Sequence, residues 1–109
     1  MEYGELKRFN GIVENFLSDA RNGKISRIQR INFYNFVWNL EKRTETQKIR
    51  FLLYYDLMPN KNEKKLTYSD IGKAYNCSIS AIRISIIEVK NTFSRIGKEK
   101  IEKLLKIIK

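Results

Sequence analysis

Residues 66–93, LTYSDIGKAYNCSISAIRISIIEVKNTF, constrain the fold most, because they hold the start and stop signals of two short helices in close succession. Thr67, followed by Asp70 three residues later, is typical of a capped helix start, and Ser78 is a good N-cap for a second helix. Asn76 lies between them, where a tight turn needs a residue that tolerates the left-handed conformation. We therefore predict two helices joined by a tight turn.

The second of these helices has two faces of different character. One face is apolar at spacings of four, three and four and is predicted to point into the core: Ile82, Ile86, Val89 and Phe93. The opposite face is expected to be exposed: Ile79, Ser80, Arg83, Ile84, Ile87 and Lys90. Residues 84–87 are rich in β-branched side chains, and the alternation along AIRISIIEV could indicate a strand. The caps favour a helix.

The first helix and the turn carry further expectations about packing. Ile71, Ala74 and Tyr75 are predicted to share one face of this helix, with Ala74 small where the two helices approach closely. Cys77 is predicted to follow the turn as a small buried group. Such a pair also occurs as an ordinary helical hairpin, but the small residue, the left-handed turn and the serine cap favour a helix-turn-helix.

Outside this segment the apolar residues keep the spacing of amphipathic helices, so the predicted fold class is all-α, a compact helical domain with N-terminal amphipathic helices. Residues 44–47, Thr-Glu-Thr-Gln, form a capping box that starts a helix. Segment 25–40 is rich in aromatic residues and is predicted to be a largely buried helix, with a strand as the alternative. The other helices are predicted to turn inward Tyr3, Leu6, Phe9, Val13, Phe16, Leu17, Ile49, Leu52, Leu53, Leu57, Ile101, Leu104, Leu105 and Ile108.

Three breaks separate these helices. Asn22-Gly23 can take positive φ angles, and the polar stretch 58–65, which contains the single proline, is the clearest loop. Gly97 is predicted to be a helix C-terminal cap.

The net charge of +10 is concentrated after residue 20. Residues 1–20 hold two basic and four acidic side chains, residues 21–60 hold eight and three, and residues 61–109 hold twelve and five. A positive surface of this kind attracts a polyanion, either nucleic acid or an anionic membrane surface. A lysine-rich, AT-rich genome is the alternative explanation for the charge.

The composition excludes several classes of protein. With one cysteine and no histidine, an intramolecular disulfide is impossible, and neither a metal site nor histidine-dependent catalysis is expected. No glycine-rich phosphate loop or nucleophile motif is present, so we expect neither an enzyme nor a cofactor. No apolar run of membrane-spanning length and no secretory signal occurs, so we expect a cytoplasmic protein.

Residues 40–93 resemble the fourth conserved region of bacterial sigma factors. There, a helix ending in an apolar-aromatic run and a loop precede the pattern T-x-x-E-I-G/A-x-x-L-G-V-S-x-x-x-V-R. KIRFLLYYDL, the polar loop and LTYSDIGKAYNCSISAIR follow the same order here. The residues that match in register are Thr67, Ile71, Gly72, Ser78, Ile82 and Arg83.

Residues 1–39 match no part of this family and are predicted to form an N-terminal helical segment that serves packing or oligomerisation. The resemblance implies a helix-turn-helix domain over residues 40–109. It also implies contact with the −35 promoter element and with the β-subunit flap of RNA polymerase. Ile79, Ser80 and Ile84 depart from the family, which has long polar side chains at these positions. Isoleucine can contact a thymine methyl group but cannot form the paired hydrogen bonds that read guanine or adenine.

We therefore expect a sequence-specific, DNA-binding transcription regulator, of a size and composition typical of phages and mobile elements. Arg83 is the best candidate for a base or phosphate contact on double-stranded DNA, with Ser80, Ile79 and Ile84 beside it in the groove. Ser78 begins the helix whose free N–H groups suit a phosphate. The residues expected to hold the DNA backbone are Lys73, Lys90 and Arg95.

Two other functions compete with this expectation. A protein-interaction module would bind RNA polymerase or a sigma factor through an apolar patch of Ile79, Ile84 and Ile87. The basic amphipathic stretch KEKIEKLLKIIK could lie on a membrane, although its apolar stripe is short and better suits a packing helix. Segment 31–38 is the candidate interface of a homodimer.

Overall fold

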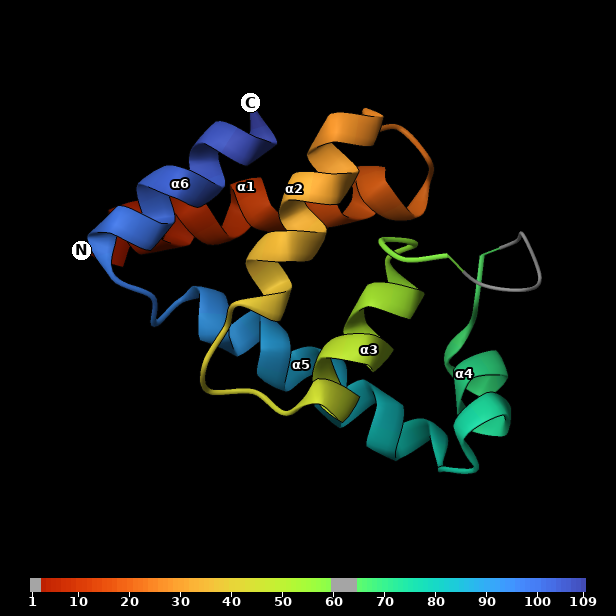
Figure 1. Cartoon of the computed structure of the whole chain (residues 1–109). Helices are drawn as coiled ribbons and strands as arrows, with labels where there is room; N and C mark the ends of the chain where they lie inside the picture. Colours follow the sequence, from red (N-terminus) through yellow and green to blue (C-terminus); the bar gives the residue numbers. More distant parts are fainter. Residues whose placement is uncertain (1–2, 60–64) are drawn as a thin grey trace.

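The computed structural model describes residues 3–59 and 65–109, with the side chain of Tyr3 left aside. Within these ranges the chain forms only helices and no strand, so the all-α prediction is confirmed and both strand alternatives are wrong (Figure 1). The helices are α1 (Tyr3–Arg21), α2 (Arg27–Trp38), α3 (Glu45–Tyr54), α4 (Tyr68–Tyr75), α5 (Ile79–Phe93) and α6 (Lys98–Ile108). Most of the predicted loop 58–65 lies outside the described residues.

The predicted helix boundaries around the α4–α5 turn are confirmed in atomic detail. The Thr67 hydroxyl accepts from the Asp70 amide at 3.1 Å, and the Asp70 carboxylate accepts from the Thr67 amide at 2.9 Å. Asn76 ends α4 in the left-handed conformation, with φ 53° and ψ 51°. The Ser78 hydroxyl then caps α5 by accepting from the Ala81 amide at 3.1 Å. Each of these signals acts within four residues, which is why the sequence alone reveals them.

The packing between α4 and α5 differs from the prediction. Ala74 is exposed, Tyr75 is 47% exposed and Cys77 is only half-buried. The close approach occurs at Gly72 instead, where an added Cβ would lie 2.7 Å from the Cys77 carbonyl oxygen. The inward face of α4 is therefore rotated toward Ile71 and Gly72, and Ala74 turns to the outside.

Two further expectations about helix ends and faces are wrong. Gly97 does not end α5. It is the N-cap of α6, with φ −71°, whereas α5 ends at Phe93 with Ser94 as its C-cap. The amides of Ser94 and Arg95 bond back to the carbonyls three residues earlier, so no left-handed residue is needed. In α2, Ile28 and Ile31 are 71% and 48% exposed, so this helix is not largely buried.

Aromatic rings from four helices meet at the centre of the molecule. Phe33 of α2 lies 4.9 Å from Phe16 of α1 and 5.8 Å from Phe93 of α5, between ring centroids. Phe51 of α3 lies 5.9 Å from Phe93. The predicted inward residues of α5 are all buried, as Ile82, Ile86, Val89 and Phe93 each have at most 2% of their surface exposed.

The same core extends from α1 to α6. Phe9, Val13, Phe16 and Leu17 contribute from α1, and Leu104 contributes from α6, all buried as the sequence predicts. Residues of segment 1–39 and of segment 40–109 thus share one hydrophobic core. Figure 1 shows α6 lying beside α1 and α2, while α3, α4 and α5 form the other end of the molecule.

Candidate nucleic-acid interface

The outward face of α5 carries most of the residues singled out from the sequence. Ile79, Ile84 and Ile87 are 48%, 56% and 46% exposed, and Ser80 and Arg83 are also exposed. These positions lie on the side of the helix opposite the buried stripe that begins at Ile82. The predicted phase of α5 is therefore confirmed by the burial of its residues.

The turn between α4 and α5 adds a basic group and a helix end to this face. An open hollow of about 460 Å³ is lined by Ser69, Gly72, Lys73, Asn76, Cys77, Ser78 and Ile79. Lys73, one of the residues that line this hollow, is exposed. The Ser78 hydroxyl satisfies one amide of the first turn of α5, and the other amides of that turn form the positive end of the helix dipole. A phosphate group is the natural ligand for such a helix end.

Arg83 lies near an aromatic ring that the sequence did not suggest. Its guanidinium carbon lies 5.8 Å from the ring centroid of Tyr68, the first residue of α4. The Tyr68 ring stacks on the Tyr54 ring of α3, with 4.5 Å between the ring centroids. On Tyr54, the guanidinium carbon of Arg21 lies 3.9 Å from the ring centroid. Burial, and then the neighbouring Tyr54, raise the pKa of Tyr68. At this distance an exposed arginine gains a weak cation–π attraction to the Tyr68 ring.

The single carboxylate of α5 is turned away from this face. Glu88 accepts from Arg43 at 2.9 Å and from Gln47 at 2.7 Å, both on or next to α3. Arg43 also donates to the Thr92 hydroxyl at 2.6 Å. Because Glu88 is ion-paired with Arg43 on the α3 side, its charge repels a polyanion less than an unpaired carboxylate would, although 40% of its side-chain surface is exposed.

Lys90, one of the residues expected to hold a DNA backbone, is turned toward α1. Its ammonium group lies 2.7 Å from the Glu14 carboxylate and 5.8 Å from the ring centroid of Tyr55. Burial lowers the pKa of Lys90, but the hydrogen bond to Glu14 and the interactions with Tyr55 outweigh it, so the net pKa is raised. A phosphate would have to compete with Glu14 for this lysine.

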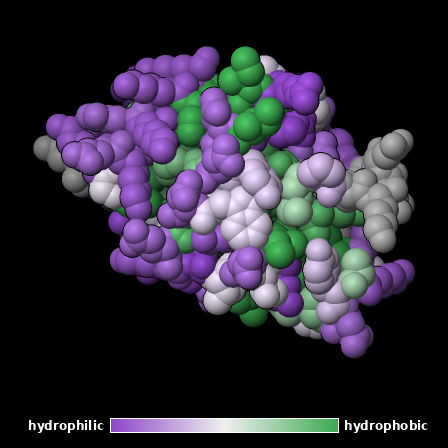
Figure 2. Space-filling view, in the orientation of Figure 1, coloured by the Kyte–Doolittle hydropathy of each residue, from purple (hydrophilic) through white to green (hydrophobic). Residues whose placement is uncertain are grey.

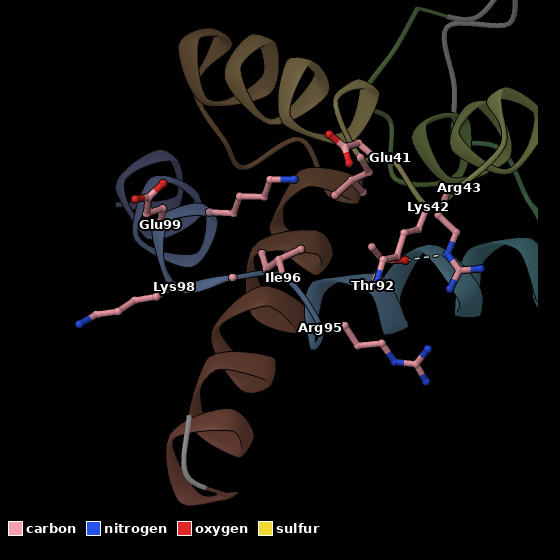
Figure 3. Close-up of a pocket in the computed structure, with 11 residues that line it drawn as sticks. Glu41, Lys42, Arg43, Thr92, Arg95, Ile96, Lys98 and Glu99 are labelled. Atoms are coloured by element: carbon pink, nitrogen blue, oxygen red, sulfur yellow. Dashed lines mark hydrogen bonds between the residues drawn. The ribbon is translucent and has the colours of Figure 1, made fainter.

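Arg95 lies apart from Lys73 and Arg83, beyond the other end of α5. About 15 Å of helix separates Arg83 from Phe93, at 1.5 Å per residue. Arg95 borders a second pocket of about 460 Å³ between the 40–43 segment and the start of α6. Figure 3 shows Arg95 and Lys98 extending in different directions, so their charges do not converge on one point.

Several other basic side chains donate hydrogen bonds within the protein. Arg21 and Arg30 donate to main-chain carbonyl groups of Tyr54 and Asp56. Lys48 is 7% exposed and donates to the Trp38 carbonyl at 2.8 Å, and Arg50 donates to the Ser85 hydroxyl at 2.9 Å. The positive surface is consequently smaller than the net charge of +10 suggests.

The described residues offer no cluster of three or more His, Cys, Asp or Glu side chains that could hold a metal ion. None of the described helices is both long and apolar enough to span a membrane. Comparison with known protein families, with curated proteins and with solved structures finds no match to this chain.

Proposed function

We propose that the chain is a sequence-specific, DNA-binding transcription regulator in which α4 and α5 form a helix-turn-helix. The observation that carries this proposal is the outward face of α5, which presents the exposed Arg83, while the only carboxylate of this helix, Glu88, is ion-paired with Arg43 and Lys73 lies exposed in the last turn of α4. A helix with its side chains is about 10–12 Å across, and a major groove is about 12 Å wide. The resemblance to sigma factor region 4 supports the same assignment.

In this proposal α5 enters the major groove with its N-terminal half. Arg83 contacts a base or a phosphate, and Ser80, Ile79 and Ile84 lie against base edges. Lys73 and the N-terminal end of α5 at Ser78 face the DNA backbone. Lys90 and Arg95 are secondary backbone contacts, because one is paired with Glu14 and the other lies beyond the far end of α5.

A gel shift with duplex DNA, run beside a pull-down of RNA polymerase, tests the proposal. We expect a shifted duplex whose amount falls as salt is raised, and a loss of that shift in Arg83→Ala. Arg27→Ala is the matched control, since Arg27 is an exposed arginine in the first turn of α2. The same loss in both variants would show that only the net charge matters.

The second candidate function is a protein-interaction module that binds RNA polymerase or a sigma factor. It is favoured by the exposed Ile79, Ile84 and Ile87, together with Tyr75, which is 47% exposed at the end of α4. Apolar patches on a protein surface often mark such interfaces. Polymerase capture that is insensitive to salt, without a DNA shift, would favour this function over DNA binding.

A homodimer interface through segment 31–38 would use the part of this segment that the core leaves accessible. Phe33, Phe36 and Val37 of this segment are buried in the core, whereas Tyr34 and Trp38 are half-buried. The apolar residues that α2 leaves exposed are Ile28 and Ile31, and Figure 2 shows hydrophobic atoms at the surface over this helix. If a dimer forms through α2, Ile28→Asp should dissociate it in sedimentation experiments without unfolding the chain.

A further inference from the structure

The outward face of α5 is more apolar than helix formation requires. Ile79, Ile84 and Ile87 are each about half exposed, although the buried stripe of this helix already supplies its packing. β-branched residues are weaker helix formers than alanine, lysine or glutamate, so exposed isoleucines add nothing to the stability of α5. Their presence on one face points to a ligand with apolar groups.

The charges around this face restrict what that ligand can be. Lys73 lies at the turn before the helix and Arg83 lies among the isoleucines, and neither is ion-paired with a carboxylate in the described part of the chain. The carboxylate of Glu88 is bound by Arg43 on the α3 side. A suitable ligand is therefore anionic at its edges and apolar between them.

The major groove of duplex DNA has this arrangement where it contains thymine. Phosphate groups line both edges of the groove, and each thymine places a C5-methyl group on the floor. The polar side chains of the N-terminal half of α5 that could bond to a base are Ser80 and Arg83. Contacts between isoleucine and methyl groups would therefore contribute much of the sequence preference.

We propose that α5 reads thymine methyl groups, chiefly through Ile79 and Ile84, and that the preferred DNA is thymine-rich. This inference rests on the proposed DNA-binding function and specifies its target. Arg83, which lies near the Tyr68 ring, and Lys73 position the helix on the backbone, and the isoleucines discriminate between bases. Ile87, on the second turn after Ile79, widens the apolar strip toward the groove edge.

Replacing thymine with uracil tests this directly, because uracil lacks the methyl group and keeps the same hydrogen-bonding groups. The probes are an alternating adenine–thymine duplex and the same duplex with uracil at every thymine. Affinity is measured by fluorescence anisotropy at one salt concentration. We expect binding of the uracil duplex to be about fourfold weaker for each methyl group that the protein buries.

Ile84→Ala should bind the two duplexes with more similar affinity than the wild-type protein does. Ile28→Ala is the matched control, since Ile28 is 71% exposed on α2, and should leave the ratio unchanged. Equal, salt-dependent binding of both duplexes by the wild-type protein would overturn methyl recognition and leave DNA binding intact. Failure to bind either duplex, or isoleucine-dependent binding of a protein instead, would overturn both proposals.

Discussion

Gly72 packs directly against the backbone of Cys77, so that a Cβ on Gly72 would lie 2.7 Å from the Cys77 carbonyl oxygen. Gly72→Ala should therefore destabilise the protein by about 1–3 kcal/mol, because the backbone on both sides of the α4–α5 turn has to shift. Urea unfolding followed by circular dichroism measures this change.

Gly11→Ala is the control for that prediction. Gly11 lies within α1, is exposed, and has open space where a Cβ would be added. Alanine is the better helix former, so this variant should be more stable by roughly 0.5–1 kcal/mol. If both variants gain stability, the close approach of α4 and α5 at Gly72 is absent in solution.

The phase of α5 is tested by two neighbouring isoleucines. Ile86 is 2% exposed and Ile87 is 46% exposed, although both lie in the same turn of the same helix. Ile86→Ala should cost about 2–5 kcal/mol through lost burial and the cavity that remains. Ile87→Ala should change stability by no more than about 0.5 kcal/mol. Similar losses in the two variants would mean that the helix is rotated from the orientation described above.

Alkaline pH should destabilise the folded protein through Tyr55 and Lys90. Burial raises the pKa of Tyr55 above 10.0, and the net pKa of Lys90 lies above 10.5. Because both values are higher in the folded state, the folded state retains more protons, and stability is lost as pH rises through these values. We expect the free energy of unfolding to fall above about pH 10.

Tyr55→Phe removes one of these titrating groups. Its free energy of unfolding, measured in urea from neutral to alkaline pH, should fall less steeply than that of the wild-type protein. A wild-type stability that rises with alkaline pH, or an unchanged slope in Tyr55→Phe, would contradict the burial of the Tyr55 hydroxyl beside Lys90.

The contribution of Arg83 to DNA binding can be divided into base reading and phosphate binding. If Arg83 bonds a base, Arg83→Ala should cost roughly 1–3 kcal/mol on the preferred site and relax the choice of base at one position. If it binds a phosphate, affinity should fall alike on all sequences and the salt slope should shrink by about one. Unchanged folding together with unchanged DNA binding would remove α5 as the recognition helix.

Local signals explain most of what the sequence predicted correctly. The caps at Thr67 and Ser78, and the left-handed Asn76, involve groups no more than four residues apart. The spacing of buried residues in α5 follows from helix periodicity alone. The DNA-binding role of α4 and α5 stays a prediction, which the exposed residues of the outward face of α5 support.

Long-range contacts explain most of what the sequence did not predict. Lys90 pairs with Glu14, which lies on the first helix of the chain, and Arg83 lies near Tyr68 of the preceding helix. No local pattern marks either pair. The net charge likewise gave no indication that Arg43 would be used to neutralise Glu88 within the fold.

The salt dependence of duplex binding tests the proposed function most directly. Fluorescence anisotropy of a labelled duplex, measured between about 50 and 200 mM salt, gives the slope of log affinity against log salt concentration. Each phosphate contact contributes about −0.9 to that slope, so phosphate contacts by both Lys73 and Arg83 predict a slope of about −1.8, and a base contact by Arg83 leaves about −0.9. A slope near zero, or no binding at the lowest salt, would contradict the assignment of α4 and α5 to DNA.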